Sequence, residues 1–151
     1  MLGVKDLFET HLTVRSLERS MKFFEEAIGL HRATVFLERR VAFYWIGESG
    51  QAMLGIWEVP HSPEVLHHHI AFRAEMRDIL QAANRLQAYG IPALDFDGEP
   101  TDEPVVLAWM PAVAIYFRDP DGNLLELLSM LPDAPEPALG VIKFSTWLAR
   151  R

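Results

Sequence analysis

The pattern that most constrains this fold is an order of secondary-structure elements that occurs twice in 151 residues. In residues 5–59, a strand-like run is followed by apolar residues at helical spacing and then by three more strand-like runs. Residues 66–130 show the same order. The two helices end in the related stretches AIGL and AYGI, although the halves share almost no other identity. The sequence therefore predicts an internal duplication of one βαβββ module.

Local signals bound each expected element. Ser16 is a plausible N-cap for the first helix, which ends at Gly29, and Gly90 closes the second helix. The expected strands are 8–15, 33–38, 40–47 and 52–59 in the first module and 67–73, 91–96, 112–117 and 123–130 in the second. Residues 105–109 could add a strand or belong to an irregular loop. The single domain is expected to span residues 1–130, and residues 131–151 to form a Pro-rich linker and a short C-terminal helix.

The composition narrows the class of protein and of partner. The net charge is −7 and no basic stripe is present, so a nucleic-acid partner is not expected. The absence of cysteine excludes disulfides and thiolate ligands. The apolar runs are too short for a membrane span, and the N-terminus lacks the apolar stretch of a signal peptide. We therefore expect a cytoplasmic protein without a membrane partner, with the acidic run 95–103 as a solvated loop.

Three residues have the chemistry of metal ligands. His11 begins the stretch HLTV on the first strand of the first module, and His69 begins HIAF at the matching place in the second. Glu126 lies inside the apolar run NLLELLSM, where a carboxylate needs a partner. Two imidazoles and one carboxylate form a ligand set that leaves metal positions open for substrate or water. Taken singly, each could instead be a hydrogen-bonded core histidine or a solvent-facing acid.

Three stretches carry a resemblance to a known family: THLTVRSLERSMKFFEEAIGL at 10–30, HHIAFRAEMRDILQAANRLQAYGIP at 68–92 and IYFRDPDGNLLEL at 115–127. Through them the chain resembles the vicinal oxygen chelate superfamily, which includes glyoxalase I, fosfomycin-resistance proteins, extradiol dioxygenases and bleomycin-resistance proteins. The resemblance implies an α+β fold in which two βαβββ modules pair into an open, U-shaped β-barrel around a divalent metal. It also implies that the ligands of a Fe2+, Mn2+, Ni2+ or Zn2+ ion are His11, His69 and Glu126.

The resemblance also distinguishes His69 from its neighbours, because family members place the ligand directly before a strand of the Ile-Ala-Phe type. Strand alternation would put His67 on the same face, as a substrate contact or a surface residue, and His68 on the other face. Tyr116 is the candidate catalytic residue, as a hydrogen-bond donor, or else an aromatic side chain packed in the barrel. Thr13 matches the fosfomycin-resistance pattern and is a candidate substrate-binding residue.

Three tryptophans lie on or near predicted strands and could line an apolar pocket or belong to the core: Trp45, Trp57 and Trp109. If they line the pocket, they favour an aromatic or otherwise hydrophobic oxygenated substrate.

The sequence departs from each enzyme branch of the superfamily. Glyoxalase I typically has a further carboxylate on the last strand of its first half. Aligning the GESG turn with DPDG places Leu54 there, and Glu58 would need a register shift. Residues 103–115 contain no Lys or Arg to hold the phosphonate of fosfomycin. The histidine of the extradiol dioxygenase signature would fall near residues 107–109, where none is present.

The resulting hypothesis is a metal-dependent enzyme acting on a small vicinally oxygenated molecule, as a glyoxalase-type lyase or isomerase or an extradiol-type dioxygenase. The alternative is a metal-free small-molecule binding protein of the bleomycin-resistance type, whose cationic ligands would suit the acidic second half. Family habit and the apolar tail predict a homodimer.

Overall fold

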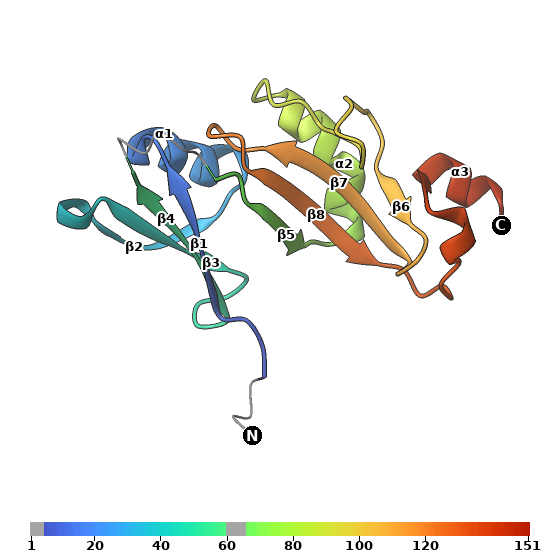
Figure 1. Ribbon diagram of the computed structural model, residues 1–151, viewed down its shortest axis with the longest axis horizontal. Coiled ribbons are helices and arrows are strands. Elements are labelled where there is room, and N and C mark those ends of the chain that lie inside the picture. Colours follow the sequence, from blue (N-terminus) through green and yellow to red (C-terminus); the bar gives the residue numbers. More distant parts are fainter. Residues whose placement is uncertain (1–4, 60–65) are drawn as a thin grey trace. The chain divides into compact units, whose positions relative to one another are not determined.

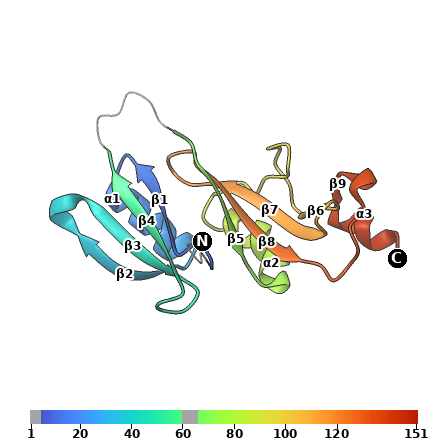
Figure 2. The same cartoon turned by 60° about the horizontal axis from the view of Figure 1, so that its bottom comes forward.

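The computed structural model describes residues 5–59 and 66–151. The chain divides into two compact units, one up to His68 and one from His69 onward. Each unit has one mixed β-sheet with a helix against it (Figures 1 and 2). The predicted α+β class is confirmed, and neither sheet closes on itself. In the described part of the chain, no helix is long and apolar enough to cross a membrane.

The first sheet has the strand order β1-β4-β3-β2. Its strands are β1 (Glu9–Val14), β2 (His31–Phe36), β3 (Val41–Ile46) and β4 (Ala52–Glu58). The β1–β4 pair is parallel and the other two pairs are antiparallel. Side chains alternate between the two faces, so the sheet has a buried face and an open one.

The helix of the first unit covers the buried face. Helix α1 (Leu17–Lys22) begins after Ser16, whose hydroxyl accepts the Arg19 N–H at 3.3 Å, as the sequence predicted. It continues as a π-helical turn, η1 (Phe23–Ala27). Fully buried apolar side chains fill the space between helix and sheet: Leu12, Leu17, Phe24, Tyr44, Leu54 and Ile56.

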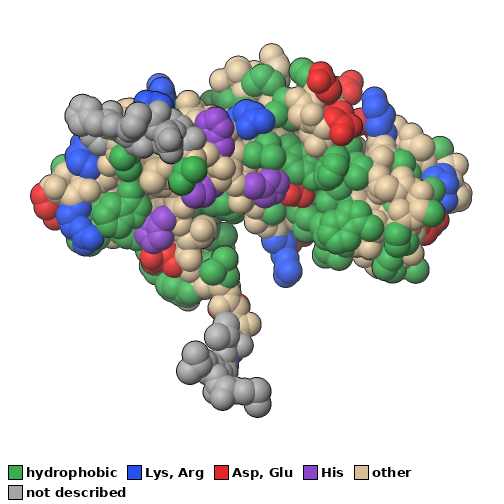
Figure 3. All heavy atoms as spheres, in the orientation of Figure 1, with side chains coloured by type: hydrophobic (Ala, Val, Ile, Leu, Met, Phe, Trp, Pro, Cys, Tyr) green, Lys and Arg blue, Asp and Glu red, His purple; other side chains and the backbone are tan. Residues whose placement is uncertain are grey.

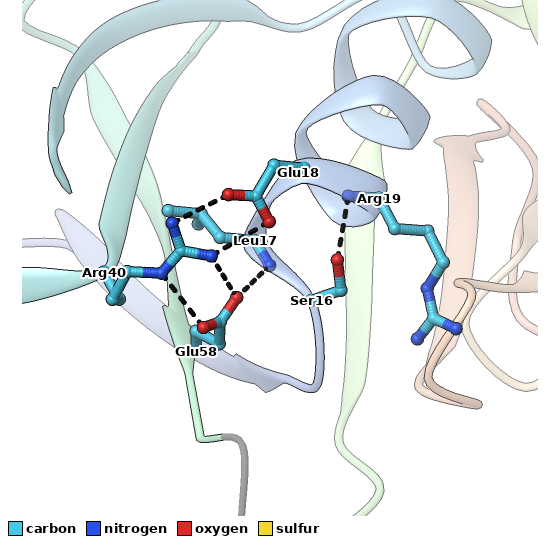
Figure 4. A network of polar contacts seen from close by, with 6 residues as sticks. All are labelled: Ser16, Leu17, Glu18, Arg19, Arg40 and Glu58. Atoms are coloured by element: carbon cyan, nitrogen blue, oxygen red, sulfur yellow. Dashed lines mark hydrogen bonds and ion pairs between the residues drawn. The ribbon is translucent and has the colours of Figure 1, made fainter.

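A network of ion pairs fastens α1 to the sheet (Figure 4). The Glu58 carboxylate accepts the Leu17 N–H at 2.6 Å and two bonds from the Arg40 guanidinium, at 2.9 and 2.6 Å. Arg40 follows the 3₁₀ turn η2 (Leu37–Arg39), has left-handed backbone geometry with φ 52°, and also pairs with Glu18 at 2.7 Å. Glu58 therefore supports the fold and caps the first turn of α1.

The second sheet has the order β5-β8-β7-β6-β9. Its strands are β5 (His69–Arg73), β6 (Val105–Leu107), β7 (Ala112–Arg118), β8 (Leu124–Met130) and β9 (Val141–Lys143). Helix α2 (Met76–Gln87) packs against β7 and β8 through Ile79, Ala82 and Leu86. After the 3₁₀ turn η3 (Pro137–Leu139), β9 pairs with β6 and leads into helix α3 (Phe144–Ala149).

Two strand predictions in the second unit need correction. Residues 91–96 do not form a strand: only Leu94 bridges to the sheet, exchanging two backbone hydrogen bonds with Tyr116 at 2.7 and 3.0 Å. Extension stops there because the Asp95 carboxylate turns the chain by accepting the N–H groups of Asp97 and Glu99. Residues 105–107, left open between strand and loop, are the strand β6. The predicted strand over 67–73 begins only at His69.

Candidate functional site

In the second unit, the parallel pairing of β5 with β8 brings His69 and Glu126 together. His69 is in register with Leu124, and Ala71 with Glu126, so both side chains lie on the face opposite α2. Nε2 of His69 lies 3.0 Å from Oε2 of Glu126. The histidine side chain is 48% exposed and the carboxylate only 7%, so the pair joins a solvent-accessible imidazole to a buried acid.

The Glu126 carboxylate is incompletely satisfied. Its Oε1 is buried and has no hydrogen-bond partner among the described residues. A buried polar group left without a partner typically costs ~1–3 kcal/mol. This oxygen and the adjacent imidazole therefore form a pair of potential metal ligands, and a bound cation would stabilise the buried carboxylate.

Tyr116 lies across the sheet from Glu126, as its register partner on β7. Its ring centroid is 6.2 Å from that of His69 and 6.3 Å from that of Phe96, and the residue is 4% exposed. Burial raises the pKa of the Tyr116 hydroxyl far above its usual value, and the nearby negative charge of Glu126 raises it further. Tyr116 is thus a neutral phenol beside the His69–Glu126 pair and can donate a hydrogen bond there.

The turn between β7 and β8 fixes this register. The buried Asp119 carboxylate accepts the N–H groups of Asp121 and Asn123 at 2.9 and 2.8 Å and the Asn123 side-chain amide at 2.7 Å. Burial raises the pKa of Asp119, although these hydrogen bonds oppose the shift. The DPDG signature thus acts by holding Tyr116 opposite Glu126.

Apolar side chains surround the pair on its face of the second sheet. Figure 3 shows hydrophobic side chains gathered over these strands. The cluster contains Leu94, Val105, Leu107, Ala114 and Tyr116, with Met110, Leu124, Leu128 and Val141 packed against it. Such a setting strengthens hydrogen bonds and ionic contacts made within it.

In the first unit, His11 lies on the open face of the sheet with both ring nitrogens engaged. The Trp57 indole N–H donates to Nδ1 at 2.5 Å, and Nε2 lies 2.6 Å from Oε1 of Glu9. The imidazole rests on the backbone of Gly55, its register partner on β4. A Cβ at position 55 would lie 2.3 Å from Nδ1, so this close approach requires glycine.

A family model, the Glyoxalase/Bleomycin resistance protein/Dioxygenase superfamily, matches residues 7–127. The chain belongs to this superfamily. An integron cassette protein from the mobile metagenome of the Halifax Harbour sewage outfall is 30% identical, with a TM-score of 0.71 over 84% of this chain and 100% of that one.

Two further solved structures share the superfamily fold. The lactoylglutathione lyase of Agrobacterium tumefaciens is 21% identical, with a TM-score of 0.63 over 83% of this chain and 94% of that one. The fosfomycin resistance protein FosX of Mesorhizobium loti is 23% identical, with a TM-score of 0.58 over 87% of this chain and 96% of that one. These likenesses are in fold, and they include proteins named for different activities.

The duplicated register identifies the first-half counterpart of Glu126. Glu126 lies two positions beyond the residue paired with His69, and the residue two positions beyond the partner of His11 is Trp57. The alignment of the two turns, which placed Leu54 there, is wrong: Leu54 is buried on the helix side. Glu58 also faces that side and is bound to Arg40 and Leu17. No carboxylate therefore takes the place of Glu126 in the described first unit.

The three ligands implied by the resemblance are divided between the units. His69 and Glu126 are in contact within the second unit, and His11 belongs to the first. Within the described part of the chain, no three His, Asp or Glu side chains gather closely enough to hold a metal ion. Among the described residues, each unit by itself brings together at most a pair of such groups.

The other predicted site residues have varied surroundings. Thr13 is exposed on β1, on the same face as His11, and Trp45 is partly buried on that face through its pairing with Met53. Trp109 is 54% exposed in the turn between β6 and β7. His67 is exposed and precedes β5.

Sequence reasoning missed two residues of the His11 site. Glu9 could have been found, since it lies two positions before His11 on a predicted strand and so shares its face. Gly55 had only the weaker signal of a glycine inside a strand, which often marks a close approach.

Proposed function

We propose that this protein is a metal-dependent enzyme acting on a small vicinally oxygenated molecule, as a glyoxalase-type lyase or isomerase or an extradiol-type dioxygenase. The observation that supports the proposal is the Glu126 carboxylate, which is 7% exposed and shares one oxygen with His69 while the other has no partner among the described residues. A cation beside this pair would remove the cost of the unsatisfied oxygen.

His69 and Glu126 of the second unit and His11 of the first would hold the metal, which would be Fe2+, Mn2+, Ni2+ or Zn2+. Imidazole nitrogen and carboxylate oxygen suit all four ions. When bound, the metal would act as a Lewis acid that stabilises negative charge developing on the oxygens of the substrate.

Around that position the chain supplies a donor and an apolar wall. Tyr116 keeps its proton, because burial and the Glu126 charge raise its pKa, and so it would donate a hydrogen bond to a substrate oxygen. Leu124 and Leu128, packed beside it, would limit the access of water and strengthen that bond. On the first sheet, Trp45 and Trp57 would contact hydrophobic parts of the substrate, and Thr13 would offer a hydroxyl.

A second candidate, a metal-free binding protein of the bleomycin-resistance type, is favoured by the surroundings of His11. Both nitrogens of that ring are engaged within the first unit, and Trp57 stands where a fourth ligand would be. In this alternative, His11 and His69 would serve as hydrogen-bonding groups for a small organic ligand.

Metal analysis of the protein purified without a tag, followed by His69→Ala and Glu126→Ala, tests the proposal. We expect stoichiometric metal in the wild type and a loss well beyond ~100-fold in affinity in both variants, since even residues that only support a ligand contribute 10–100-fold. Matched controls are His31→Ala and Glu99→Ala, two exposed residues outside the site, which should keep the metal. Sub-stoichiometric metal that neither site substitution changes would favour the metal-free alternative.

We further propose a cytoplasmic homodimer with a small-molecule substrate and no nucleic-acid partner. The proposal rests on the superfamily and on the absence of a basic stripe. Mass measurement in solution at micromolar concentration tests the oligomeric state, and a monomeric mass would contradict it.

A further inference from the structure

The hydrogen bond between Trp57 and His11 determines which nitrogen of His11 carries the proton. An indole N–H can only donate, so Nδ1 of His11, 2.5 Å away, must accept. In a neutral imidazole the proton then lies on Nε2, which faces the Glu9 carboxylate at 2.6 Å. Glu9 can only accept, so both contacts favour the same tautomer.

That tautomer is the wrong one for a metal ligand at Nε2. Ligation through Nε2 requires its lone pair, so a neutral ring must move its proton to Nδ1. There the proton would meet the Trp57 N–H, and two donors would face each other. Histidine ligands generally donate their second nitrogen's proton to an acceptor, which indole is not.

The second unit lacks this conflict. The register counterpart of Trp57 is Glu126, which accepts and is itself a candidate ligand. His69 is paired with Leu124 where His11 has Gly55, and its side chain is the more exposed, 48% against 37%. The two histidines therefore occupy matching backbone positions but differ in readiness to bind a cation.

We propose that Trp57 is a positioning residue that holds His11 as the Nε2–H tautomer and so weakens the contribution of the first unit to a metal site. The inference rests on the proposed function for its metal-binding consequence, whereas the tautomer follows from the two contacts of His11. Metal uptake then requires the Trp57–His11 hydrogen bond to break.

The test combines nitrogen NMR of labelled histidine with Zn2+ titration of the full chain. In the metal-free wild type, we expect His11 to show a protonated Nε2 and an unprotonated Nδ1. In Trp57→Phe, which keeps an aromatic ring but removes the donor, the Nδ1–H form should become populated and the affinity for Zn2+ should rise roughly 10-fold, the equivalent of about one lost hydrogen bond. Trp147→Phe, which changes a tryptophan of helix α3 in the second unit, should alter neither.

The outcomes separate this inference from the proposed function. If neither wild type nor Trp57→Phe binds Zn2+, the metal-dependent function fails, and the His11 tautomer still decides the role of Trp57. A wild-type His11 protonated on Nδ1 overturns the inference, as does an unchanged His11 tautomer in Trp57→Phe. Where the wild type binds Zn2+, an unchanged or lower Zn2+ affinity in Trp57→Phe also overturns it.

Discussion

The two units place a histidine at the same register position and give it partners of opposite character. His69 meets a buried carboxylate, Glu126, whose second oxygen has no partner among the described residues. At the matching register position His11 meets an indole donor, Trp57, and its other nitrogen faces Glu9 on its own strand. The backbone of the duplicated module has been retained while the chemistry beside each histidine has diverged. A duplicated fold therefore supplies the positions of its ligands, and single side chains decide which half is ready to use them.

The largest effect is expected at the carboxylate that distinguishes the second unit. Glu126→Leu should reduce metal affinity by more than ~100-fold, since it removes a ligand rather than a supporting residue. The same change should raise the unfolding free energy of the metal-free protein by ~1–3 kcal/mol, because a buried unsatisfied oxygen is lost. Metal titration and chemical denaturation of the apoprotein check the two signs, and a less stable apoprotein would contradict the cost assigned to Oε1.

The converse change would make the first unit resemble the second. Trp57→Glu replaces the indole donor with an acceptor at the register position of Glu126, so His11 could carry its proton on Nδ1 and free Nε2. We expect Zn2+ affinity to rise at least ~10-fold, or about 1.4 kcal/mol. Calorimetric titration measures it, with Trp45→Glu as the control for an added charge on that face.

Gly55→Ala tests the close approach that only the first unit makes. The new Cβ would meet the His11 ring, with Nδ1 at 2.3 Å, and Phe43, at 3.2 Å. The ring can move, so we expect a stability loss of about 1 kcal/mol, at the low end for overpacking. The indole N–H resonance of Trp57 should also shift as its hydrogen bond to Nδ1 breaks. An unshifted resonance would show that the position of the His11 ring, and its hydrogen bond to Trp57, do not depend on Gly55.

The smallest expected effect is a difference in acid sensitivity between the units. Hydrogen bonds from Arg40 and from the Leu17 N–H lower the pKa of Glu58, and Arg40 lowers that of Glu18 to about 2. A lowered carboxylate pKa stabilises the fold above the unfolded value of about 4.3, and this stabilisation is lost as the pH falls toward the folded value. In the second unit Leu127 takes the register position of Glu58, so β5, β8 and α2 lack this ion pair. Glu103, whose pKa is also lowered, contacts Ser145 and Lys143 in the segment of β9 and α3 instead.

Hydrogen exchange of the two units between about pH 5 and pH 2 checks this difference. Amides of β1, β4 and α1 should lose protection before those of β5, β8 and α2. Glu58→Gln should reduce the pH dependence of the first unit, and the exposed Glu48→Gln should not. Equal acid sensitivity in both units would contradict the role given to the network.

The sequence predicted the repeated module because hydrophobic periodicity reports which residues face a core. It also predicted that His69 and Glu126 belong to one site. It failed at Trp57 for a geometric reason. Five positions separate Gly50 from Gly55, the partner of His11, but only two separate Gly122 from Leu124, the partner of His69. The two separations differ by an odd number of positions. Aligning the turns therefore picks Leu54, which lies on the opposite face of β4 from Trp57.

Other features depended on contacts distant in sequence. The predicted strand over 91–96 is reduced to the single bridge of Leu94 to Tyr116, and β9 pairs with β6 although no strand was predicted there. Both outcomes arise only when the sheet has formed. That Oε1 of Glu126 has no hydrogen-bond partner among the described residues likewise depends on what surrounds it in space.

The three-residue strand β9 has a consequence for solubility. By pairing with β6 (Val105–Leu107), whose side chains are all apolar, it satisfies backbone N–H and C=O groups that would otherwise be free at the edge of the sheet. Its own outer side is short and ends in Lys143, features that discourage another chain from adding a strand. We therefore expect a chain cut before β9 to expose β6 as an edge strand and to aggregate more readily than the full chain.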